Sequence, residues 1–444
     1  MKTVEKHSRT WLIAGLCIFL LFSVGPAAMG AEDKNKTRCE GTKQQRKQKM
    51  ELRVVTEEQF QKLMEQNKKT VAADLQEMAD TVLRRLEREY EQHEVSGEPF
   101  VYDVLVISGG GAKGAFGSGF LEGWGTVKGP MARPEFDAVN GVSTGSLIAP
   151  FAFVGTDEAL TSIADFYANP DPNWATKRGK MYFMPKHVSL FNDCHLQDTL
   201  RGAIDKPLVE ALAKGQAEDR LLLIGTTNLD AGRGQVFDLG REAKEALQSG
   251  SLDRIPSILL ASSAIPGVFP PMEIDGMYYG DGGATSNLFI VGFSKDDGPL
   301  ARFTKRHPEA PLPKIRVWVL VNEPLVPVPA LTQPRWLSVG GHALQTLTST
   351  NELFALELTK AMLHEARTEH GLDTEFHLVS IPEELFKTKT MTYQEAKQAA
   401  KEKEKVGMFD KEFMNKLEDL GRKMGADPSS WTTKIPSAYS FSRD

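Results

Sequence analysis

The chain has 444 residues, of which 25% are charged and 41% hydrophobic, and both fractions are ordinary for a globular protein. A chain of this length can bury one large core and still carry appended segments. The formal net charge of −6 and the lack of a basic cluster give no reason to expect binding to nucleic acid.

The first thirty residues have the parts of a secretory signal peptide. A basic start with Lys2, Lys6 and Arg9 precedes the apolar residues 11–24, and small residues follow. The apolar stretch is short for a membrane span. We therefore expect residues 1–30 to be a signal peptide and the protein to be exported, to a periplasm, a cell envelope or the medium. The alternative is an uncleaved N-terminal segment that anchors the chain.

Removal of the signal peptide would leave two cysteines, Cys39 and Cys194. Export makes a disulfide between them feasible, because disulfides persist in oxidising compartments. Their wide separation in the sequence leaves the unpaired state equally open.

Residues 31–98 are predicted to be a polar linker and an amphipathic helical extension. Residues 31–55 are polar and basic, with no apolar period. Thr56 and Gln59 then form a capping box, and apolar residues follow at helical spacing up to a break at residues 96–99. We expect this extension to pack against the following domain, with a lipid surface or a partner as the alternative.

A glycine-rich segment follows the first predicted strand. Residues 101–108 are apolar and β-branched, and residues 109–119 contain six glycines. Consecutive glycines let backbone N–H groups converge on one spot, and a following helix adds its positive end. Such a nest suits a tetrahedral oxyanion or a phosphate. No clean strand ends near residue 135, as a dinucleotide site requires, and no Gly-Lys-Ser/Thr of a P-loop follows.

Residues 141–145 read Gly-Val-Ser-Thr-Gly directly after the apolar residues 136–139. This is the Gly-x-Ser-x-Gly pattern of a nucleophile elbow, in which a serine lies on a sharp turn between a strand and a helix. Side chains at Gly141 and Gly145 would clash with the neighbouring backbone. Ser143 is therefore the candidate nucleophile.

An aspartate at the end of a short aromatic segment is the candidate base. Asp281 follows residues 277–280 and precedes two glycines. An aspartate held there can accept the serine proton directly, which gives a dyad instead of a triad. The alternative is an ordinary Asp-Gly hairpin turn. No histidine lies at an obvious strand end with glycine neighbours, so the sequence offers no strong candidate for a His-based triad.

Together these segments resemble the patatin-like phospholipase family. The blocks that carry the resemblance appear in the family's order and spacing at residues 109–114, 141–145 and 281–283, with supporting stretches at 226–230 and 261–271. The resemblance covers roughly residues 100–380. Ser108 departs from the pattern, because many members have an aspartate before the glycines.

The resemblance implies a serine acyl hydrolase on a three-layer α/β/α fold. Ser143 would be the nucleophile and Asp281 the base, and the N–H groups of Gly109, Gly110 and Gly111 would hold the oxyanion. The implied reaction is hydrolysis of a phospholipid or another lipid ester through an acyl-enzyme, of the phospholipase A or lysophospholipase type. The resemblance implies no cofactor and no metal.

Lys113, within the glycine-rich block, has two alternative roles. It contacts an anionic head group of the substrate, or it caps the loop. The sequence favours neither.

Alternating strands and helices predict a mostly parallel sheet with helices on both faces. Further buried strands are expected at residues 221–227, 315–321 and 376–382, with a long helix at 341–370. These elements predict one domain over residues 99–385.

Two peripheral segments complete the prediction. Residues 169–192 are rich in proline, methionine and aromatic residues, and we expect them to cover the core, with an acyl-chain wall or lid as the alternative. Residues 386–444 are predicted to be a C-terminal helical extension. It contains a charged, solvated helix, a second helix at residues 410–424, and a tail whose Trp431, Tyr439 and Phe441 pack back onto the body.

A second class of function remains open beside the enzyme. A catalytically silent member of the family would bind lipid or a partner without turnover. Contact with a membrane surface fits both classes. The sequence determines neither the head group and acyl length of the substrate nor the oligomeric state.

Overall fold

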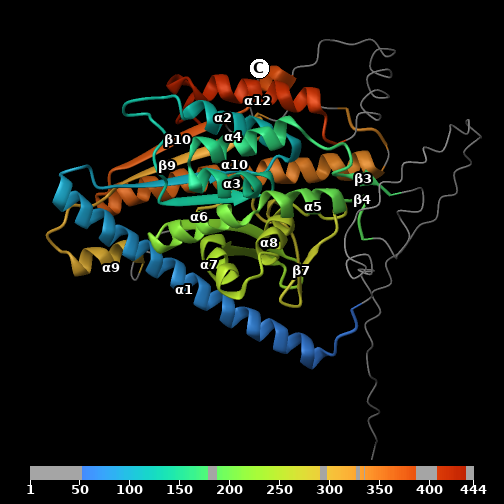
Figure 1. Cartoon of the computed structure of the whole chain (residues 1–444), viewed down its shortest axis with the longest axis horizontal. Coiled ribbons are helices and arrows are strands. Elements are labelled where there is room, and N and C mark those ends of the chain that lie inside the picture. The colour runs from blue at the N-terminus through green and yellow to red at the C-terminus, as the bar shows by residue number, and fades with distance from the viewer. Residues whose placement is uncertain are drawn as a thin grey trace, which may run out of the picture. The chain divides into compact units, whose positions relative to one another are not determined.

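The computed structural model describes residues 53–178, 188–290, 298–326, 331–334, 336–386 and 408–436 (Figure 1). The predicted signal peptide at residues 1–30, residues 31–52 of the linker, and Cys39 lie outside the described residues. So do residues 179–187 of the aromatic segment, the charged stretch 387–407, and the tail residues Tyr439 and Phe441. All described residues fall within one compact unit of the chain, residues 41–444. Within the described ranges, every helix is too short or too polar to cross a bilayer.

A mixed, mostly parallel sheet forms the centre of the fold, which confirms the predicted α/β class. Its parallel strands lie in the order β10-β9-β1-β2-β5. Their bounds are β1 (Val101–Ile107), β2 (Ala138–Val142), β5 (Leu221–Asn228), β9 (Lys314–Val321) and β10 (Thr374–Ser380). β1, β2, β5 and β9 are buried almost throughout, as expected for strands covered on both faces. β10, at the edge of the sheet, alternates between buried and partly buried residues.

Three antiparallel strands that the sequence analysis did not separate complete the sheet. They are β6 (Arg233–Asp238), β7 (Met272–Ile274) and β8 (Met277–Asp281). β6 pairs with β5 along one edge, and β8 pairs with the last three residues of β5. β7 then pairs with β8 at the end of the sheet. A separate short hairpin joins β3 (Thr176–Lys177) to β4 (Phe191–Asn192).

Helices cover both faces of the sheet. They are α1 (Glu57–Ser96), α2 (Gly114–Trp124), α3 (Thr144–Val154), α4 (Asp157–Ala168), α5 (Cys194–Ala203), α6 (Lys206–Ala217), α7 (Leu239–Ser249), α8 (Arg254–Ser262), α9 (Pro299–Arg306), α10 (Trp336–His370) and α12 (Lys411–Gly425). Short 3₁₀ turns are η2 (Gly111–Lys113), η3 (Gly282–Ala284), η4 (Glu383–Phe386) and η5 (Pro428–Ser430).

Alternate residues of each strand enter two separate hydrophobic cores, which establishes the three-layer arrangement. Leu105 and Ile107 of β1 pack in the core formed with α2, α3 and α12. Val104 and Val106 of the same strand pack in the core formed with α1, α9 and α10. Since successive side chains of a strand point to opposite faces, one helical layer lies on each side of the sheet.

The N-terminal extension is one continuous helix. α1 begins after Thr56, whose hydroxyl accepts a hydrogen bond from the Gln59 N–H in the predicted capping box, and it ends at Gly97 with φ 69°. Its buried face includes Leu83 and Leu86, which contribute to the core beneath the sheet. The helix therefore packs against the domain, as predicted.

The C-terminal helix is also part of the core. α12 lies along α2 (Figure 1), and its Met414 and Leu417 are fully buried. A Cβ at Gly421 would overlap the backbone oxygen of Phe116, and one at Gly119 would overlap that of Glu418. The two helices can approach this closely only because glycines line the crossing.

Trp431 packs back onto the body, as the sequence analysis expected. It contacts Trp124, with ring centroids 4.8 Å apart, and Trp318, with centroids 5.2 Å apart. The neighbouring Thr432 bridges to Leu378 of β10.

Cys194, the first residue of α5, is disulfide-bonded. The unpaired state that the sequence left open therefore does not apply to this residue. The other two cysteines of the chain, Cys17 and Cys39, lie outside the described residues.

Candidate active site

Two strands that run in opposite directions meet end to end at one edge of β5. β2 pairs with β5 up to Gly225, and β8 pairs with the same edge from Thr226 onward. β6 occupies the opposite edge over both stretches, so β2 and β8 share one edge. The carboxyl end of β2 therefore faces the carboxyl end of β8. The next residue after β2 is Ser143, and the last residue of β8 is Asp281.

Ser143 lies on a strained turn between β2 and α3. Its backbone has φ 52° and ψ −124°, which a residue with a side chain adopts only under constraint from its surroundings. The Ser143 N–H donates to Ser262 Oγ at 2.9 Å, and Ser262 Oγ donates to the Gly225 carbonyl at 2.7 Å. The Ser263 hydroxyl donates to the Ser143 carbonyl at 3.2 Å. This is the backbone geometry of a nucleophile elbow.

The glycines that flank Ser143 are required by close backbone contacts. A Cβ at Gly145 would overlap the carbonyl oxygens of Ile107 and Ser108, at the end of β1. A Cβ at Gly141 would overlap the backbone of Gly145 itself. The steric reason given for these two glycines in the sequence analysis is thus visible in the structure.

Ser143 and Asp281 form a direct hydrogen bond. The Ser143 hydroxyl donates to Asp281 Oδ2 at 2.7 Å, and the Gly283 N–H donates to Asp281 Oδ1 at 2.8 Å. Both side chains are buried. Burial raises the pKa of Asp281 to about 6, although the hydrogen bonds from Ser143 and Gly283 act in the opposite direction. A carboxylate with a pKa near neutrality can take up and return a proton at physiological pH.

The described histidines do not contact this pair. His377 stacks on Trp318 with ring centroids 4.0 Å apart, and His307 packs on Phe303. His342 forms a hydrogen bond with Thr332 at the start of α10. In the part of the chain that the structure describes, Asp281 is the base within reach of Ser143.

The glycine-rich loop lies directly beside the nucleophile, but it differs in one respect from the prediction. A Cβ at Gly109 would lie 3.1 Å from the Ser143 Cβ. The Gly109 N–H is buried and donates to the Asn287 carbonyl at 3.2 Å, so it is not available to an oxyanion. This contact does not support the predicted role of Gly109 as an oxyanion donor.

Gly110 and Gly111 are the more accessible residues of the loop. Their N–H groups donate to no acceptor among the described residues, and both residues are at least partly exposed. Gly110 precedes the short turn η2 and Gly111 begins it, and η2 leads into α2, so the positive end of α2 lies nearby. Gly110 and Gly111 stay the predicted oxyanion donors.

Lys113 is paired within the protein. Its ammonium group forms an ion pair with Glu323, two residues beyond the end of β9. The pair ties the glycine-rich loop to the neighbouring strand end. Of the two predicted roles of Lys113, this contact supports anchoring of the loop and leaves the head-group role without support.

Several residues around the site were not singled out by the sequence analysis. Ser262 holds the elbow, and Asn287 holds the glycine-rich loop through the Gly109 N–H. Glu352 of α10 accepts a hydrogen bond from Asn287 Nδ2 at 2.9 Å. The only sequence signal for Glu352 is that no other charged residue occurs between residues 336 and 356.

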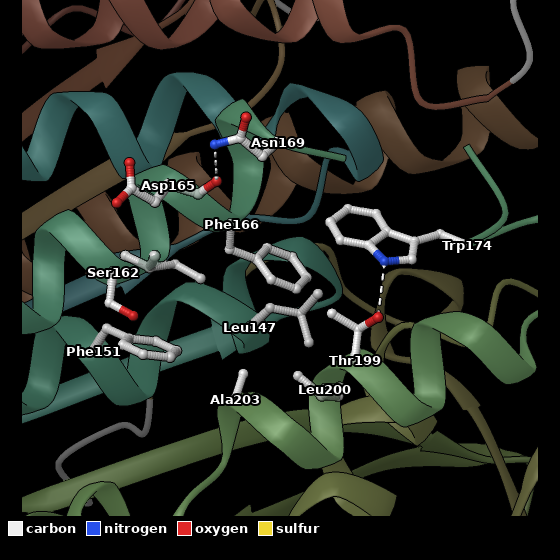
Figure 2. Close-up of a pocket in the computed structure, with 11 residues that line it drawn as sticks. Leu147, Phe151, Ser162, Asp165, Phe166, Asn169, Trp174, Thr199, Leu200 and Ala203 are labelled. Atoms are coloured by element: carbon white, nitrogen blue, oxygen red, sulfur yellow. Dashed lines mark hydrogen bonds between the residues drawn. The ribbon is translucent and has the colours of Figure 1, made fainter. Parts of the chain in front are cut away.

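An apolar cavity lies along α3, the helix that begins next to Ser143 (Figure 2). Its volume is about 310 Å³. Leu147, one helical turn beyond Ser143, lines it, and Figure 2 shows side chains from α4 and α5 around the same space. The apolar lining comprises Leu147, Phe151, Ile163, Phe166, Trp174, Leu200 and Ala203.

Trp174 belongs to the aromatic segment 169–192 and is buried. Its Nε1 donates to Thr199 Oγ1 at 3.1 Å, across the cavity's edge (Figure 2). Trp174 is therefore buried in the core, as expected for this segment, and it also forms part of the apolar wall of the cavity, which was the alternative. Tyr182, Phe183 and Met184 of the same segment lie outside the described residues.

In the described ranges, no group of three or more His, Cys, Asp or Glu side chains is placed to hold a metal ion.

Comparison with known proteins gives a match to one family model and similarity to solved structures. Residues 105–293 match the family model described as patatin-like phospholipase. Both Ser143 and Asp281 lie within the matched range. Among solved structures, the chain is similar to the crystal structure of VipD from Legionella pneumophila, with 12% sequence identity and a TM-score of 0.33. That similarity covers 73% of this chain and 67% of the VipD chain. No curated protein matches the chain.

Proposed function

We propose that this chain, which carries a patatin-like phospholipase domain over residues 105–293, hydrolyses acyl esters of phospholipids or related lipids through Ser143 and Asp281. The family of the domain identifies a lipid hydrolase in general terms. The Ser–Asp dyad and the phospholipase A or lysophospholipase type are our proposals. The observation that carries them is the 2.7 Å hydrogen bond from the Ser143 hydroxyl to Asp281 Oδ2, beside the glycine-rich loop.

The first half of the proposed reaction forms an acyl-enzyme. Asp281 Oδ2 takes the hydroxyl proton while Ser143 Oγ attacks the ester carbonyl carbon. The negative charge that develops on the carbonyl oxygen is stabilised by the N–H groups of Gly110 and Gly111. The bond to the alcohol oxygen then breaks, and the alcohol leaves with the proton held by Asp281.

The second half returns the enzyme to its starting state. Asp281 takes a proton from a water molecule, which attacks the acyl carbon bonded to Ser143 Oγ. The bond between Ser143 and the acyl group breaks, the proton passes to Ser143, and the fatty acid is released. The dyad ends with the proton on Ser143, as it began.

Release of fatty acid from defined vesicles tests the proposal. Phosphatidylcholine with palmitate at one position and oleate at the other shows by mass spectrometry which acyl chain is removed, and the lysophospholipid product tests the second substrate class. We expect release by the wild type and none by Ser143→Ala. The alternative, a silent lipid-binding protein, predicts vesicle binding without release, and that result would contradict the proposal.

The cavity along α3 is our candidate site for the acyl chain. Ala203 of α5 lines it, and a larger side chain there would fill it (Figure 2). We expect Ala203→Phe to lower kcat/KM for long-chain esters roughly tenfold, because two methylene groups of the chain lose their apolar contacts at about 0.8 kcal/mol each. The butyrate ester should be hydrolysed at the wild-type rate.

Gly202→Ala is the matched control for this variant. Gly202 is the neighbouring residue of α5, is exposed, and has no atom within 4 Å of an added Cβ. Comparison of p-nitrophenyl palmitate with the butyrate gives the measurement. An equal loss on both esters, or an unchanged rate on the palmitate, would place the acyl chain elsewhere.

Export of the protein is also part of the proposal. The disulfide at Cys194 supports it, because disulfides are typical of oxidising compartments outside the cytosol. The mass of the mature chain, which cleavage after residue 30 would reduce, separates the signal peptide from an uncleaved anchor.

A further inference from the structure

Asn287 is buried shortly after Asp281 in the chain, and the proposed reaction does not use its side chain. Its amide oxygen lies between the glycine-rich loop and the turn that holds the base. We propose that Asn287 is a positioning residue, whose side-chain oxygen sets the spacing of these two segments, and that residue 109 is glycine to leave room for that oxygen. This inference rests on the proposed function, because the spacing matters only if Ser143 attacks an ester.

The first contact of Asn287 is with Gly109 of the glycine-rich loop. The Gly109 N–H donates to the Asn287 carbonyl at 3.2 Å, which joins the two backbones. A Cβ at Gly109 would lie 2.2 Å from Asn287 Oδ1 and 3.1 Å from the Ser143 Cβ. Because a real Cβ does not approach another heavy atom within 3.0 Å, the amide oxygen fills the space that a side chain at residue 109 would need.

Neither the backbone nor the N–H of Gly109 requires a glycine. Its φ lies outside the left-handed region, whereas the nearby Gly111 has φ 58°. An alanine in place of Gly109 would keep the same N–H. The room that Asn287 Oδ1 takes is therefore the physical reason that the structure gives for glycine here.

The same oxygen contacts the turn that holds the base. A Cβ at Gly283 would lie 3.1 Å from Asn287 Oδ1 and 3.1 Å from Asp281 Oδ1. The Gly283 N–H orients the base, because it donates to Asp281 Oδ1 at 2.8 Å. One atom of Asn287 thus lies against the backbone beside the nucleophile and against the backbone that orients the base.

Glu352 of α10 fixes the direction in which the Asn287 amide points. Asn287 Nδ2 donates to Glu352 Oε1 at 2.9 Å, and both residues are buried. The nitrogen of an amide donates and its oxygen only accepts, so this bond leaves Oδ1 on the side of the two glycines. Since a buried hydrogen bond is costly to break, the side chain cannot swing aside to admit a Cβ at Gly109.

The spacing affects the rate of the chemical step more than the binding of substrate. A displaced glycine-rich loop moves the N–H groups of Gly110 and Gly111 relative to Ser143. A misplacement of about 1 Å can lower a rate on the order of a hundredfold. Substitutions that disturb the contact should therefore lower kcat and leave KM nearly unchanged.

A double-mutant cycle on Gly109 and Asn287 tests the contact, with p-nitrophenyl butyrate as the substrate. Gly109→Ala should lower kcat about a hundredfold, because the added Cβ displaces the loop. Asn287→Ala should lower kcat about tenfold, because the loop loses its spacer. The double variant should be no less active than Asn287→Ala alone, since the Cβ then occupies the space that Oδ1 vacates. Independent sites would give a loss of about a thousandfold, and that result would overturn the proposal.

Gly117→Ala is the matched control for this recovery. A Cβ at Gly117 would lie 2.4 Å from Oδ1 of a different asparagine, Asn322. Gly117 belongs to α2, and its φ also lies outside the left-handed region. Asn287→Ala should not restore kcat to Gly117→Ala. Recovery there would show that Asn287→Ala loosens the fold in general, which would contradict a specific contact with Gly109.

Thermal unfolding reads the same contact without turnover. The Tm of Gly109→Ala should lie below that of the wild type, and the Tm of the double variant should be no lower than that of Asn287→Ala. Recovery of Tm without recovery of kcat would show a structural contact only and would overturn the positioning role. A wild type that hydrolyses no ester and takes up no phosphonate would refute the proposed function, and the positioning role with it. Additive losses of kcat and Tm in an active enzyme would refute the contact alone.

Discussion

Ser143→Ala is expected to abolish ester hydrolysis, with a loss in kcat/KM on the order of 10⁴-fold or more. The substitution removes only the hydroxyl that donates to Asp281 Oδ2. The backbone bonds that hold the elbow, from the Ser143 N–H to Ser262 and from Ser263 to the Ser143 carbonyl, do not involve that hydroxyl. The fold should therefore persist, and circular dichroism beside the kinetics checks that it does.

The residual activity of Ser143→Ala shows whether Ser143 is the group that attacks the ester. Activity above about 1% of the wild type in a folded, homogeneous Ser143→Ala preparation would show that another group attacks the ester. Since no acyl-enzyme can form on alanine, the proposed mechanism leaves no route to such activity.

Asp281→Asn is expected to lower kcat on the order of 10³-fold to 10⁴-fold, because it removes the general base. The Gly283 N–H must still be accepted by the side-chain oxygen, so the NH₂ group faces Ser143. The serine then accepts a hydrogen bond instead of donating one, and its proton has no acceptor. A rate profile against pH gives the complementary measurement, since wild-type activity should fall below about pH 6 as Asp281 is protonated.

The same variant should be more stable than the wild type at pH 7, which separates a catalytic role from a structural one. The folded state raises the pKa of Asp281 from 3.8 to about 6, so folded Asp281 binds a proton that the unfolded chain releases in this range. Stability from this group is present below about pH 4 and is lost as pH rises to 6. Loss of both activity and stability in Asp281→Asn would instead indicate a structural aspartate, and normal activity would return attention to the histidines.

The sequence predicts the parallel part of the fold well because that part depends on local patterns. Runs of β-branched and aliphatic residues predict β1, β5, β9 and β10 within two residues of their observed ends. The antiparallel strands β6 and β7 were missed, because each is short or partly exposed and has no continuous apolar run. The position of β8 beyond the end of β2 depends on pairing with β5, which no local pattern encodes.

The candidate active site likewise contains residues that the sequence predicts and residues that it does not. The residue types at positions 143 and 281 follow from glycine-bounded turns, whose steric requirements can be read from sequence. Engagement of the Gly109 N–H by Asn287 could not be predicted, because it depends on a contact between segments 178 residues apart. Glu352 is a still clearer case, since its contact with Asn287 is made by a helix far from every motif.

The C-terminal extension shows how a regular pattern can hide close packing. The helix at residues 410–424 was predicted, and its amphipathic spacing is real. Its glycines gave no reason to expect that Gly421 and Gly425 would admit the backbone of α2 at the crossing. Small residues predict a close approach only when the opposing helix is known.

Intact-mass analysis of the mature protein after treatment with a fluorophosphonate tests the central claim most directly. A phosphonate adds covalently to a serine only when a neighbouring base and an oxyanion site activate it. The account predicts one adduct on the wild type and none on Ser143→Ala. An adduct on Ser143→Ala, or no adduct on a folded wild type that binds phospholipid vesicles, would contradict it.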